Sequence, residues 1–267
     1  MMLLIDIGNS RIKWHIQSEQ QPFTLHTTPF AIDHHDPLWP DQLSHAWSAL
    51  TCPRVCFISN VAANAVLEKV QQRIQMLFGA LDTHMVRPQK HTANFTLAYD
   101  DPNQMGANRF AQLLGAQAIC AAHNHLVISA GTATTIDGVL ANGKHLGGVI
   151  APSMHLMRTS LHQHTARLPL SGGAFSPSHA PHNTLDALAS GAHLATQGAI
   201  LSFMNHYMPN APTPWLLCGG GAAVLAKDLA ASAELHTATI QVVPSLCLLG
   251  VWQFSRSTAH PHTHPPL

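Results

Sequence analysis

The stretch Leu3-Leu4-Ile5-Asp6-Ile7-Gly8-Asn9-Ser10-Arg11-Ile12-Lys13-Trp14 decides the fold of this chain. An apolar run ends at Asp6, a turn of small residues follows, and apolar residues then alternate from Ile12 to Ile16. This pattern predicts a buried strand, a tight turn and a second strand. Gly8 lets the backbone approach a ligand closely, and the N–H groups of such a turn suit an anion. Taken alone, the pattern fits an ordinary hairpin and a phosphate-binding turn about equally well.

A second copy of the stretch decides between these two interpretations. Leu126-Val127-Ile128-Ser129-Ala130-Gly131-Thr132-Ala133-Thr134-Thr135 aligns without a gap on residues 3–12. Both copies continue in a β pattern, and Asn142-Gly143 in the second is a strong hairpin signal. The repetition favours a duplicated nucleotide-binding fold, with one phosphate turn in each half and a shared cleft between the halves.

Composition agrees with this architecture and excludes several classes of partner. The 267 residues fit two α/β halves, and 13 basic against 13 acidic residues indicate neither nucleic acid nor an anionic membrane as a partner. Only 10% of residues are charged, so we expect an oligomer that hides part of the surface. No apolar run is long enough to cross a bilayer, and the first residues lack a secretion signal. The five cysteines form no CxxC pair, which is typical of reduced thiols in a cytoplasmic protein.

Local patterns predict the remaining elements. We expect a short extended piece at residues 23–25, a helix over 41–50, and a strand over 55–58 followed by a helix that Asn60 caps. Further helices are expected over 104–122, 154–164, 184–205, 222–229 and 246–254, and further strands over 215–218 and 239–243. The predicted domains are residues 1–122 with the first phosphate turn, residues 123–254 with the second, and a flexible His/Pro-rich tail, residues 255–267.

Seven motifs in order carry a family resemblance. They are Asp6-x-Gly8-Asn9-Ser10-x-x-Lys13, Tyr99-Asp100-Asp101-Pro102-x-x-x-Gly106-Ala107-Asn108-Arg109, Gly131-Thr132-Ala133-Thr134-Thr135-Ile136-Asp137, Gly147-Gly148-x-Ile150-x-Pro152, Thr165-Ala166-Arg167-Leu168-Pro169, Asn183-Thr184-x-x-Ala187-x-x-Ser190-Gly191 and Gly219-Gly220-Gly221-Ala222. The set resembles type III pantothenate kinase, a bacterial family of the acetate-and-sugar-kinase, chaperone and actin superfamily. The resemblance covers about residues 1 to 250.

The resemblance implies an α/β fold of two duplicated ribonuclease-H-like (actin-like ATPase) domains that face a central nucleotide cleft. It implies ATP-dependent phosphorylation of pantothenate to 4'-phosphopantothenate, the first step of coenzyme A biosynthesis, by a cytoplasmic homodimer. The ATP-binding positions would be Asp6, Ile7, Gly8, Asn9, Ser10, Arg11, Ile12, Lys13 and Thr132, with Asp6 holding Mg²⁺ through water. The glycine turn at 219–222 would lie near the adenosine. The pantothenate-binding positions would be Tyr99, Gly106, Ala107, Asn108, Arg109 and Thr184, with Arg109 paired to the carboxylate of pantothenate.

Two departures from the family pattern bear on catalysis. Asn108 stands where the family has the Asp that takes the proton from the substrate hydroxyl. An amide is not a base, although its oxygen can accept a hydrogen bond and orient the hydroxyl, so we expect a slower reaction. Ser129 stands where many relatives have an Asp that binds K⁺ or NH₄⁺, which puts the need for a monovalent cation in doubt. Asp100, Asp101 and Asp137 are the candidate substitute carboxylates.

Two alternatives stay open from the sequence. Asn108 is compatible with a catalytically weakened homologue that acts as a regulatory or accessory binding protein, as some relatives are described. The fold is also compatible with a kinase for another small alcohol. The 21 histidines include three close groups, but none has the spacing of a structural or catalytic zinc site, and we expect them to be polar surface residues.

Overall fold

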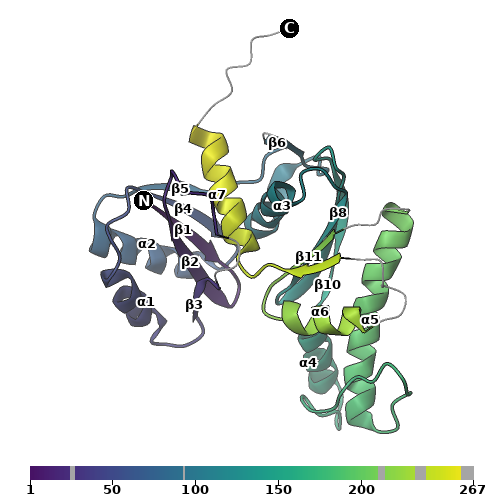
Figure 1. The fold of residues 1–267 in the computed structure, drawn as a ribbon. Helices are drawn as coiled ribbons and strands as arrows, with labels where there is room; N and C mark the ends of the chain where they lie inside the picture. Colours follow the sequence, from purple (N-terminus) through teal and green to yellow (C-terminus); the bar gives the residue numbers. More distant parts are fainter. Residues whose placement is uncertain (25–27, 93, 210–213, 232–238, 260–267) are drawn as a thin grey trace. The chain divides into compact units, whose positions relative to one another are not determined.

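The computed structural model describes residues 1–24, 28–92, 94–209, 214–231 and 239–259 (Figure 1). The chain divides into two compact α/β units. Unit 1 comprises residues 1–121, 142–144 and 243–267, and unit 2 comprises residues 122–141 and 145–242. Within the described residues, we find no helix that combines the length and the apolar character needed to cross a bilayer.

Unit 1 is built on a five-stranded sheet in the order β3-β2-β1-β4-β5. Its strands are β1 (Met2–Ile7), β2 (Arg11–Gln17), β3 (Phe30–Asp33), β4 (Val55–Asn60) and β5 (Asp82–Met85). The helices are α1 (Trp39–Ser48), α2 (Asn64–Phe78), α3 (Ala107–Ile119) and α7 (Leu246–Ala259), and the short pieces are β6 (His91–Thr92), β7 (Phe95–Thr96) and the 3₁₀ helix η1 (Pro102–Gln104). The central strand β1 runs antiparallel to β2 and parallel to β4.

Alternation along β1 decides what each face of this sheet contacts. Leu3, Ile5 and Ile7 are fully buried in a core that includes Trp47 of α1 and Val70 of α2. Burying one such apolar side chain stabilises the unit by about 1.5–3 kcal/mol. The neighbouring residues on β1, Asp6 among them, point to the opposite face, where α7 packs against β1 and α3 (Figure 1). The alternation along β1 therefore places the Asp6 carboxylate on the face of the sheet that α7 covers.

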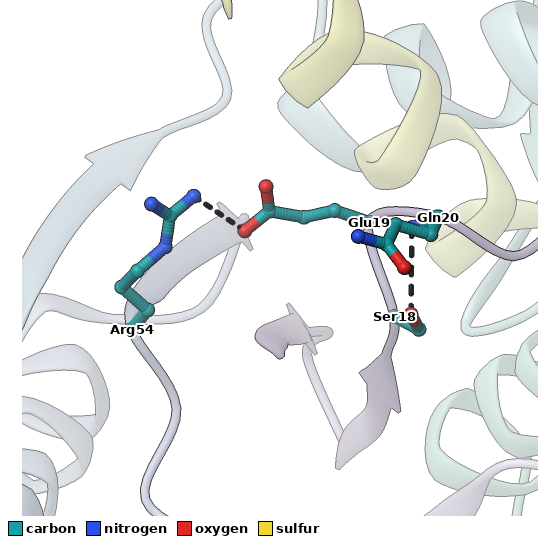
Figure 2. A network of polar contacts seen from close by, with 4 residues as sticks. All are labelled: Ser18, Glu19, Gln20 and Arg54. Carbon is teal, nitrogen blue, oxygen red and sulfur yellow. Dashed lines mark hydrogen bonds and ion pairs between the residues drawn. The ribbon is translucent and has the colours of Figure 1, made fainter.

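The polar turn after β2 lies at the other end of the sheet from Gly8. Figure 2 shows its contacts: Glu19 Oε1 pairs with Arg54 Nη2 at 2.6 Å, and the Gln20 N–H donates to Ser18 Oγ at 3.4 Å. The Arg54 side chain is 75% exposed, so this ion pair contributes little to stability, about 0–1 kcal/mol. Substitutions here are suitable controls for substitutions near Gly8.

Unit 2 repeats the same topology, with a sheet in the order β10-β9-β8-β11-β12. Its strands are β8 (His125–Ala130), β9 (Ala133–Val139), β10 (His145–Pro152), β11 (Pro214–Cys218) and β12 (Thr239–Val242), and its helices are α4 (Met154–His164), α5 (Thr184–Tyr207) and α6 (Ala222–Ala230). The central strand β8 is antiparallel to β9 and parallel to β11, as β1 is to β2 and β4. Leu126 and Ile128 of β8 pack with Phe203 of α5 and Leu225 of α6. The predicted duplication of an α/β unit is confirmed.

The two phosphate turns differ in length. Ile7 pairs with Ile12 in unit 1, which leaves residues 8–11 in the turn, whereas Ala130 pairs with Thr134 in unit 2, which leaves residues 131–133. The gapless alignment of the two copies therefore holds through the first strand and the start of the turn. Beyond the turn, the second strand of unit 2 pairs one residue earlier.

Several predicted elements differ from the structure. The extended piece expected at residues 23–25 is not a strand at Phe23 and Thr24, and the third strand is Phe30–Asp33 instead. Asn60 does not cap α2, whose N-cap is Ala63. The side-chain oxygen of Asn60 instead accepts a hydrogen bond from the Ala62 N–H at 3.1 Å. Helix α7, expected with the second half, packs on α3 and β1 of unit 1. That helix also includes residues 255–259 of the expected tail, and residues 260–267 lie outside the described residues.

Candidate functional site

The turn after β1 gathers the first group of predicted site residues. The Gly8 N–H donates to the Arg11 carbonyl at 3.0 Å and closes the turn, and Lys13 lies opposite Asp6 on the paired strand. Gly8 and Ser10 are half-buried, and Arg11 is exposed. The backbone of Gly8 is not in the left-handed region, and an added Cβ would meet only the Arg11 carbonyl, at 3.4 Å. The chain itself does not require glycine here, which is the behaviour expected of a turn that a ligand approaches closely.

Asp6 is a buried carboxylate that lacks part of its hydrogen bonding. The residue is 6% exposed, and its Oδ1 has no hydrogen-bond partner among the described residues. Burial raises the pKa of Asp6, and the positive charge of Lys13 and a hydrogen bond from the Cys247 thiol oppose that rise. A buried oxygen without a partner beside a cationic side chain is suited to a hydrated divalent cation or to a donor that comes with a ligand.

His34 supports the first turn, and no sequence pattern indicated this role. Its Nε2–H donates to the Gly8 carbonyl at 2.9 Å, and its backbone N–H donates to the Ser10 carbonyl at 3.1 Å. His34 follows β3, a strand that no local pattern in the sequence predicts. The two bonds hold the Gly8 and Ser10 carbonyls and so tie the first turn to the residue that follows β3.

The N-terminus of α3 gathers the second group. Arg109 is 6% exposed, its Nη1 donates to the Tyr99 hydroxyl at 3.0 Å, and its guanidinium lies 5.8 Å from the centroid of the same ring. Tyr99 is itself held by Lys90, whose Nζ donates to the Tyr99 carbonyl at 2.9 Å. A buried guanidinium supported in this way is pre-organised to bind a carboxylate through paired N–H groups. The structure therefore brings together Tyr99 and Arg109, two of the positions that the resemblance assigns to pantothenate.

Asn108 differs from the sequence expectation. Its Oδ1 accepts a hydrogen bond from the Arg109 backbone N–H at 2.7 Å. Because a backbone N–H only donates, this contact also fixes which end of the amide is the oxygen. The oxygen that was expected to accept a hydrogen bond from the substrate hydroxyl thus already accepts one, which leaves it a second lone pair. The side chain also offers its NH₂ group as a donor.

Unit 2 carries the second phosphate turn and, beside it, the glycine turn. The Gly131 N–H donates to the Ala133 carbonyl at 3.1 Å, and Thr132 is exposed at the tip. The Gly221 N–H donates to the Ala130 carbonyl at 2.9 Å, so the glycine turn is joined to the end of β8. Gly219 has φ +93°, and an added Cβ there would lie 2.5 Å from the Ala130 carbonyl oxygen. Nothing lies within 4 Å of a Cβ at Gly220, which leaves that backbone open to a ligand.

The positions considered for a monovalent cation are Ser129 and three candidate carboxylates, and the carboxylates already make local contacts. Ser129 is half-buried on β8. Asp137 is 1% exposed and its Oδ1 is 3.0 Å from His145 Nε2, so that carboxylate already has a partner. Asp101 accepts from the Asn103 N–H at 3.0 Å as the N-cap of η1, and Asp100 is exposed near Lys90. Each of these three acids thus has a local contact that explains its presence.

Thr184 is the first residue of α5 and is exposed. It lines a cavity of ≈ 430 Å³ between α4 and α5 that is otherwise largely apolar. The other lining residues are Met157, Arg158, Leu161, Leu168, Ala187, Leu188, Gly191 and Ala192. Of the predicted pantothenate residues, Thr184 lies in unit 2, and the others lie in unit 1.

Solved structures agree with the fold. A Campylobacter jejuni protein assigned to the Baf family of transcriptional activators aligns with a TM-score of 0.59 at 21% identity, covering 97% of this chain and 99% of that one. The activator of 2-hydroxyisocaproyl-CoA dehydratase from Clostridium difficile, solved with bound ADPNP, aligns with a TM-score of 0.53 at 11% identity, covering 100% and 98%. At these identities the likeness concerns the fold alone, which is an actin-like ATPase fold.

Comparison with related sequences identifies the family, whereas the solved structures show the fold alone. A protein named type III pantothenate kinase from Burkholderia mallei is 35% identical over 250 residues, covering 88% of this chain and 94% of that protein. The family model of type III pantothenate kinases matches residues 2–206, which include both phosphate turns and the start of α3. The chain belongs to the type III pantothenate kinase family.

Proposed function

We propose that this protein is an enzyme that transfers the γ-phosphoryl group of ATP to the hydroxyl of pantothenate, giving 4'-phosphopantothenate in the first step of coenzyme A biosynthesis. The observation that carries the proposal is a family match that spans both phosphate turns of a duplicated ATPase fold. The buried and supported Arg109 gives the proposal a site for the carboxylate of pantothenate.

The phosphates of ATP would contact residues 6–13 in unit 1 and Thr132 in unit 2. The N–H groups of the first turn and the Lys13 ammonium suit phosphate oxygens, and the Gly8 backbone permits close approach. Residues 106–109, Tyr99 and Thr184 would contact pantothenate, in agreement with the polar groups at the start of α3 and α5. The glycine turn, with its open Gly220, would lie near the adenosine.

Mg²⁺ fits the donor set at Asp6. The unpartnered Oδ1 noted above is a hard oxygen donor, and Mg²⁺ prefers to bind through one or two carboxylates and retained water. The ion would offset charge on the phosphates during transfer. At Ser129 a hydroxyl replaces the carboxylate of many relatives, so we expect the rate to depend little on K⁺ or NH₄⁺.

Asn108 defines how this enzyme would differ from relatives that have Asp. Phosphoryl transfer proceeds through a loose transition state, in which positioning and charge stabilisation dominate. The reaction therefore does not require a base at position 108, although a base would accelerate it. The NH₂ group of Asn108 would donate to an oxygen of the reacting groups, while the proton of the hydroxyl leaves to phosphate or water.

We also propose a cytoplasmic homodimer. β10, α4 and α5 each carry exposed apolar side chains, among them Ile150 at 65%, Leu161 at 44% and Leu194 at 56%. Large apolar side chains left exposed in a chain with few charges favour an interface that covers some of them. Light scattering coupled to size exclusion tests the dimer, and a monomer at micromolar concentration would contradict it.

One assay tests the function. The purified protein is incubated with Mg²⁺, ATP and pantothenate, and 4'-phosphopantothenate is followed by mass spectrometry, with Asn108→Asp measured in parallel. Turnover by the unaltered chain is the expected result. Turnover by Asn108→Asp alone would instead indicate a catalytically weakened homologue, and turnover of other small alcohols alone would indicate a different substrate.

A further inference from the structure

His34 contacts the first phosphate turn at two points. Its Nε2 lies 2.9 Å from the Gly8 carbonyl oxygen, and its backbone N–H donates to the Ser10 carbonyl at 3.1 Å. A carbonyl oxygen only accepts, so Nε2 carries the proton in the first of these bonds. His34 lies 26 residues from Gly8 in the sequence, so the turn is held by a part of the chain outside its own hairpin.

The backbone around His34 determines where the imidazole lies. Asp33, the last residue of β3, lies opposite Arg11 on β2. A tight turn follows, in which the Asp36 N–H donates to the Asp33 carbonyl at 3.3 Å and the His35 N–H donates to Asp33 Oδ1 at 2.9 Å. Asp residues often stabilise turns in this way. This turn has its own hydrogen bonds, so it places His34 beside the phosphate turn without help from the imidazole.

The other end of β3 is anchored by aromatic contacts. The Phe30 ring stacks on Trp14 of β2, with ring centroids 5.7 Å apart and planes 15° apart. Trp14 in turn contacts Trp47 of α1 edge to face, with centroids 6.0 Å apart. Because β3 is an edge strand and pairs on one side only, these ring contacts add to its attachment to the sheet. The strand that carries His34 to the turn is therefore held at both ends.

The bond from the imidazole sets the direction of the next N–H group in the turn. A trans peptide group is planar, so the Gly8 carbonyl and the Asn9 N–H point in opposite directions. With that carbonyl held by His34, the Asn9 N–H is directed away from the imidazole. Asn9 is exposed at the tip of the turn, and N–H groups in such a turn suit an anion.

Glycine at position 8 makes this restraint necessary. Glycine adopts more backbone conformations than other residues, and a Cβ at Gly8 would meet only the Arg11 carbonyl oxygen, at 3.4 Å. The Gly8 N–H bond to the Arg11 carbonyl fixes the peptide group before Gly8, whereas the peptide group after it is the one that the imidazole holds. Loss of the imidazole would therefore let the Asn9 N–H rotate away from its direction.

We propose that His34 is a positioning residue for the phosphate turn, whose imidazole holds the Gly8 carbonyl so that the Asn9 N–H is directed to a phosphate oxygen of ATP. The backbone bond from His34 to Ser10 holds the other side of the same turn. The proposal rests on the proposed function for the assignment of this turn to the phosphates.

Calorimetry with inorganic tripolyphosphate and Mg²⁺ tests the role without adenosine, pantothenate or turnover. His34→Met removes the donor and keeps a long side chain, and affinity is expected to fall about three- to tenfold, the change that corresponds to one neutral hydrogen bond. His34→Gln places an amide N–H at a similar reach and is expected to restore affinity to within about twofold.

The matched control is His84→Met. His84 is exposed on β5, at the opposite edge of the same sheet, and its Nε2 contacts Asp82 Oδ2 at 2.9 Å. The substitution makes the same change of side chain and also removes a hydrogen bond, away from the phosphate turn. It is expected to bind tripolyphosphate as the unaltered chain does.

The amide resonances of the turn test the direction of the N–H group itself. When tripolyphosphate is added to the unaltered chain, the Asn9 amide proton should move downfield, as expected for a hydrogen bond to an ionised acceptor. The shift at saturation should be smaller in His34→Met and should recover in His34→Gln. The Gly79 amide, which donates to the Gln75 carbonyl at the end of α2, should not move in any variant.

Two results would overturn the proposal: a His34→Met protein that binds tripolyphosphate as the unaltered chain does, or a His34→Gln protein that binds as weakly as His34→Met. Circular dichroism at the temperature of the calorimetry checks that each variant is folded, which separates loss of affinity from loss of fold. Binding that follows the donor, in a protein that forms no phosphopantothenate, would support the positioning role and contradict the proposed substrate. Formation of phosphopantothenate with binding that does not follow the donor would contradict the positioning role alone.

Discussion

Asn108 Oδ1 accepts a hydrogen bond from the backbone N–H of Arg109, with the two atoms 2.7 Å apart. In Asn108→Asp, one carboxylate oxygen can keep this bond while the other becomes a base for the substrate hydroxyl. General-base catalysis contributes about 100- to 10,000-fold, so we expect kcat to rise within that range. Initial rates of phosphopantothenate formation at saturating substrates measure the change.

The matched control is Asn64→Asp. Asn64 is exposed in the first turn of α2, so the substitution adds the same charge at a helix N-terminus away from α3. Both variants should gain about 0.3–1 kcal/mol of stability from the helix dipole, and only Asn108→Asp should gain rate. An equal gain in both variants, or none in either, would show that position 108 does not contact the reacting hydroxyl.

Gly8→Ala should separate folding from nucleotide binding. The Gly8 backbone is outside the left-handed region and the new Cβ would be in ordinary contact at 3.4 Å, so stability should be unchanged or higher by up to about 1 kcal/mol. The methyl group would occupy the space that phosphate needs, so the Kd for ATP should rise at least about tenfold, or 1.4 kcal/mol. Calorimetry and thermal unfolding measure the two effects. Gly198→Ala, in open space on α5, is the control and should leave ATP affinity unaltered.

Gly219→Ala should reduce the stability of the fold, in contrast to Gly8→Ala. The positive φ of +93° and the Ala130 carbonyl 2.5 Å from the new Cβ make alanine strained at this position. We expect a loss of stability of about 1–3 kcal/mol, measured by chemical denaturation. Gly220→Ala, one residue on, has neither problem. Equal stability of Gly219→Ala and Gly220→Ala would show that alanine is not strained at position 219.

Arg109→Met should remove preference for a carboxylate. We compare pantothenate with pantothenol, which has a hydroxyl in place of the carboxylate. KM for pantothenate should rise about 10- to 100-fold, the value of a charge-assisted hydrogen bond, and KM for pantothenol should change little. Arg54→Met, which breaks the exposed ion pair of Figure 2, is the control. A parallel rise for both alcohols would place Arg109 in support of the fold and not in recognition of the carboxylate.

The sequence predicts the fold well where local pattern determines structure. β1, β2, α4 and α5 lie within two residues of their expected bounds, because apolar periodicity and caps such as Asn183 act locally. The edge strand β3 was missed, since its residues are largely exposed and show no alternation of buried side chains. Its neighbour His34 was therefore missed as a support of the first turn.

Contacts that depend on tertiary packing could not be predicted from local pattern. Nothing near Cys247 in the sequence indicates Asp6, because α7 joins unit 1 only after the chain has completed unit 2. The occupied oxygen of Asn108 also depends on backbone geometry at the start of α3. The family resemblance indicated the candidate residues, whereas their contacts could be seen only in the folded structure.

His125 should make stability depend on pH. Burial lowers the pKa of His125, whose Nδ1–H donates to the His123 carbonyl at 2.9 Å and whose buried Nε2 has no hydrogen-bond partner among the described residues. The nearby His123 lowers that pKa further when charged. The unfolded chain therefore binds a proton before the folded chain does. The contribution of neutral His125 is complete above about pH 6.5 and is lost as pH falls below it, by up to about 1.4 kcal/mol per unit.

His125→Asn isolates this effect, because its amide can still donate to the His123 carbonyl and does not titrate. The free energy of unfolding, measured by denaturant titration at several pH values, should fall less steeply below about pH 6.5 in this variant than in the unaltered chain. His164→Gln, at an exposed position at the end of α4, is the control and should keep the steep fall. Since the comparison uses slopes, a constant loss of packing in His125→Asn does not affect it. Identical slopes for His125→Asn and the unaltered chain would show that another group governs acid stability.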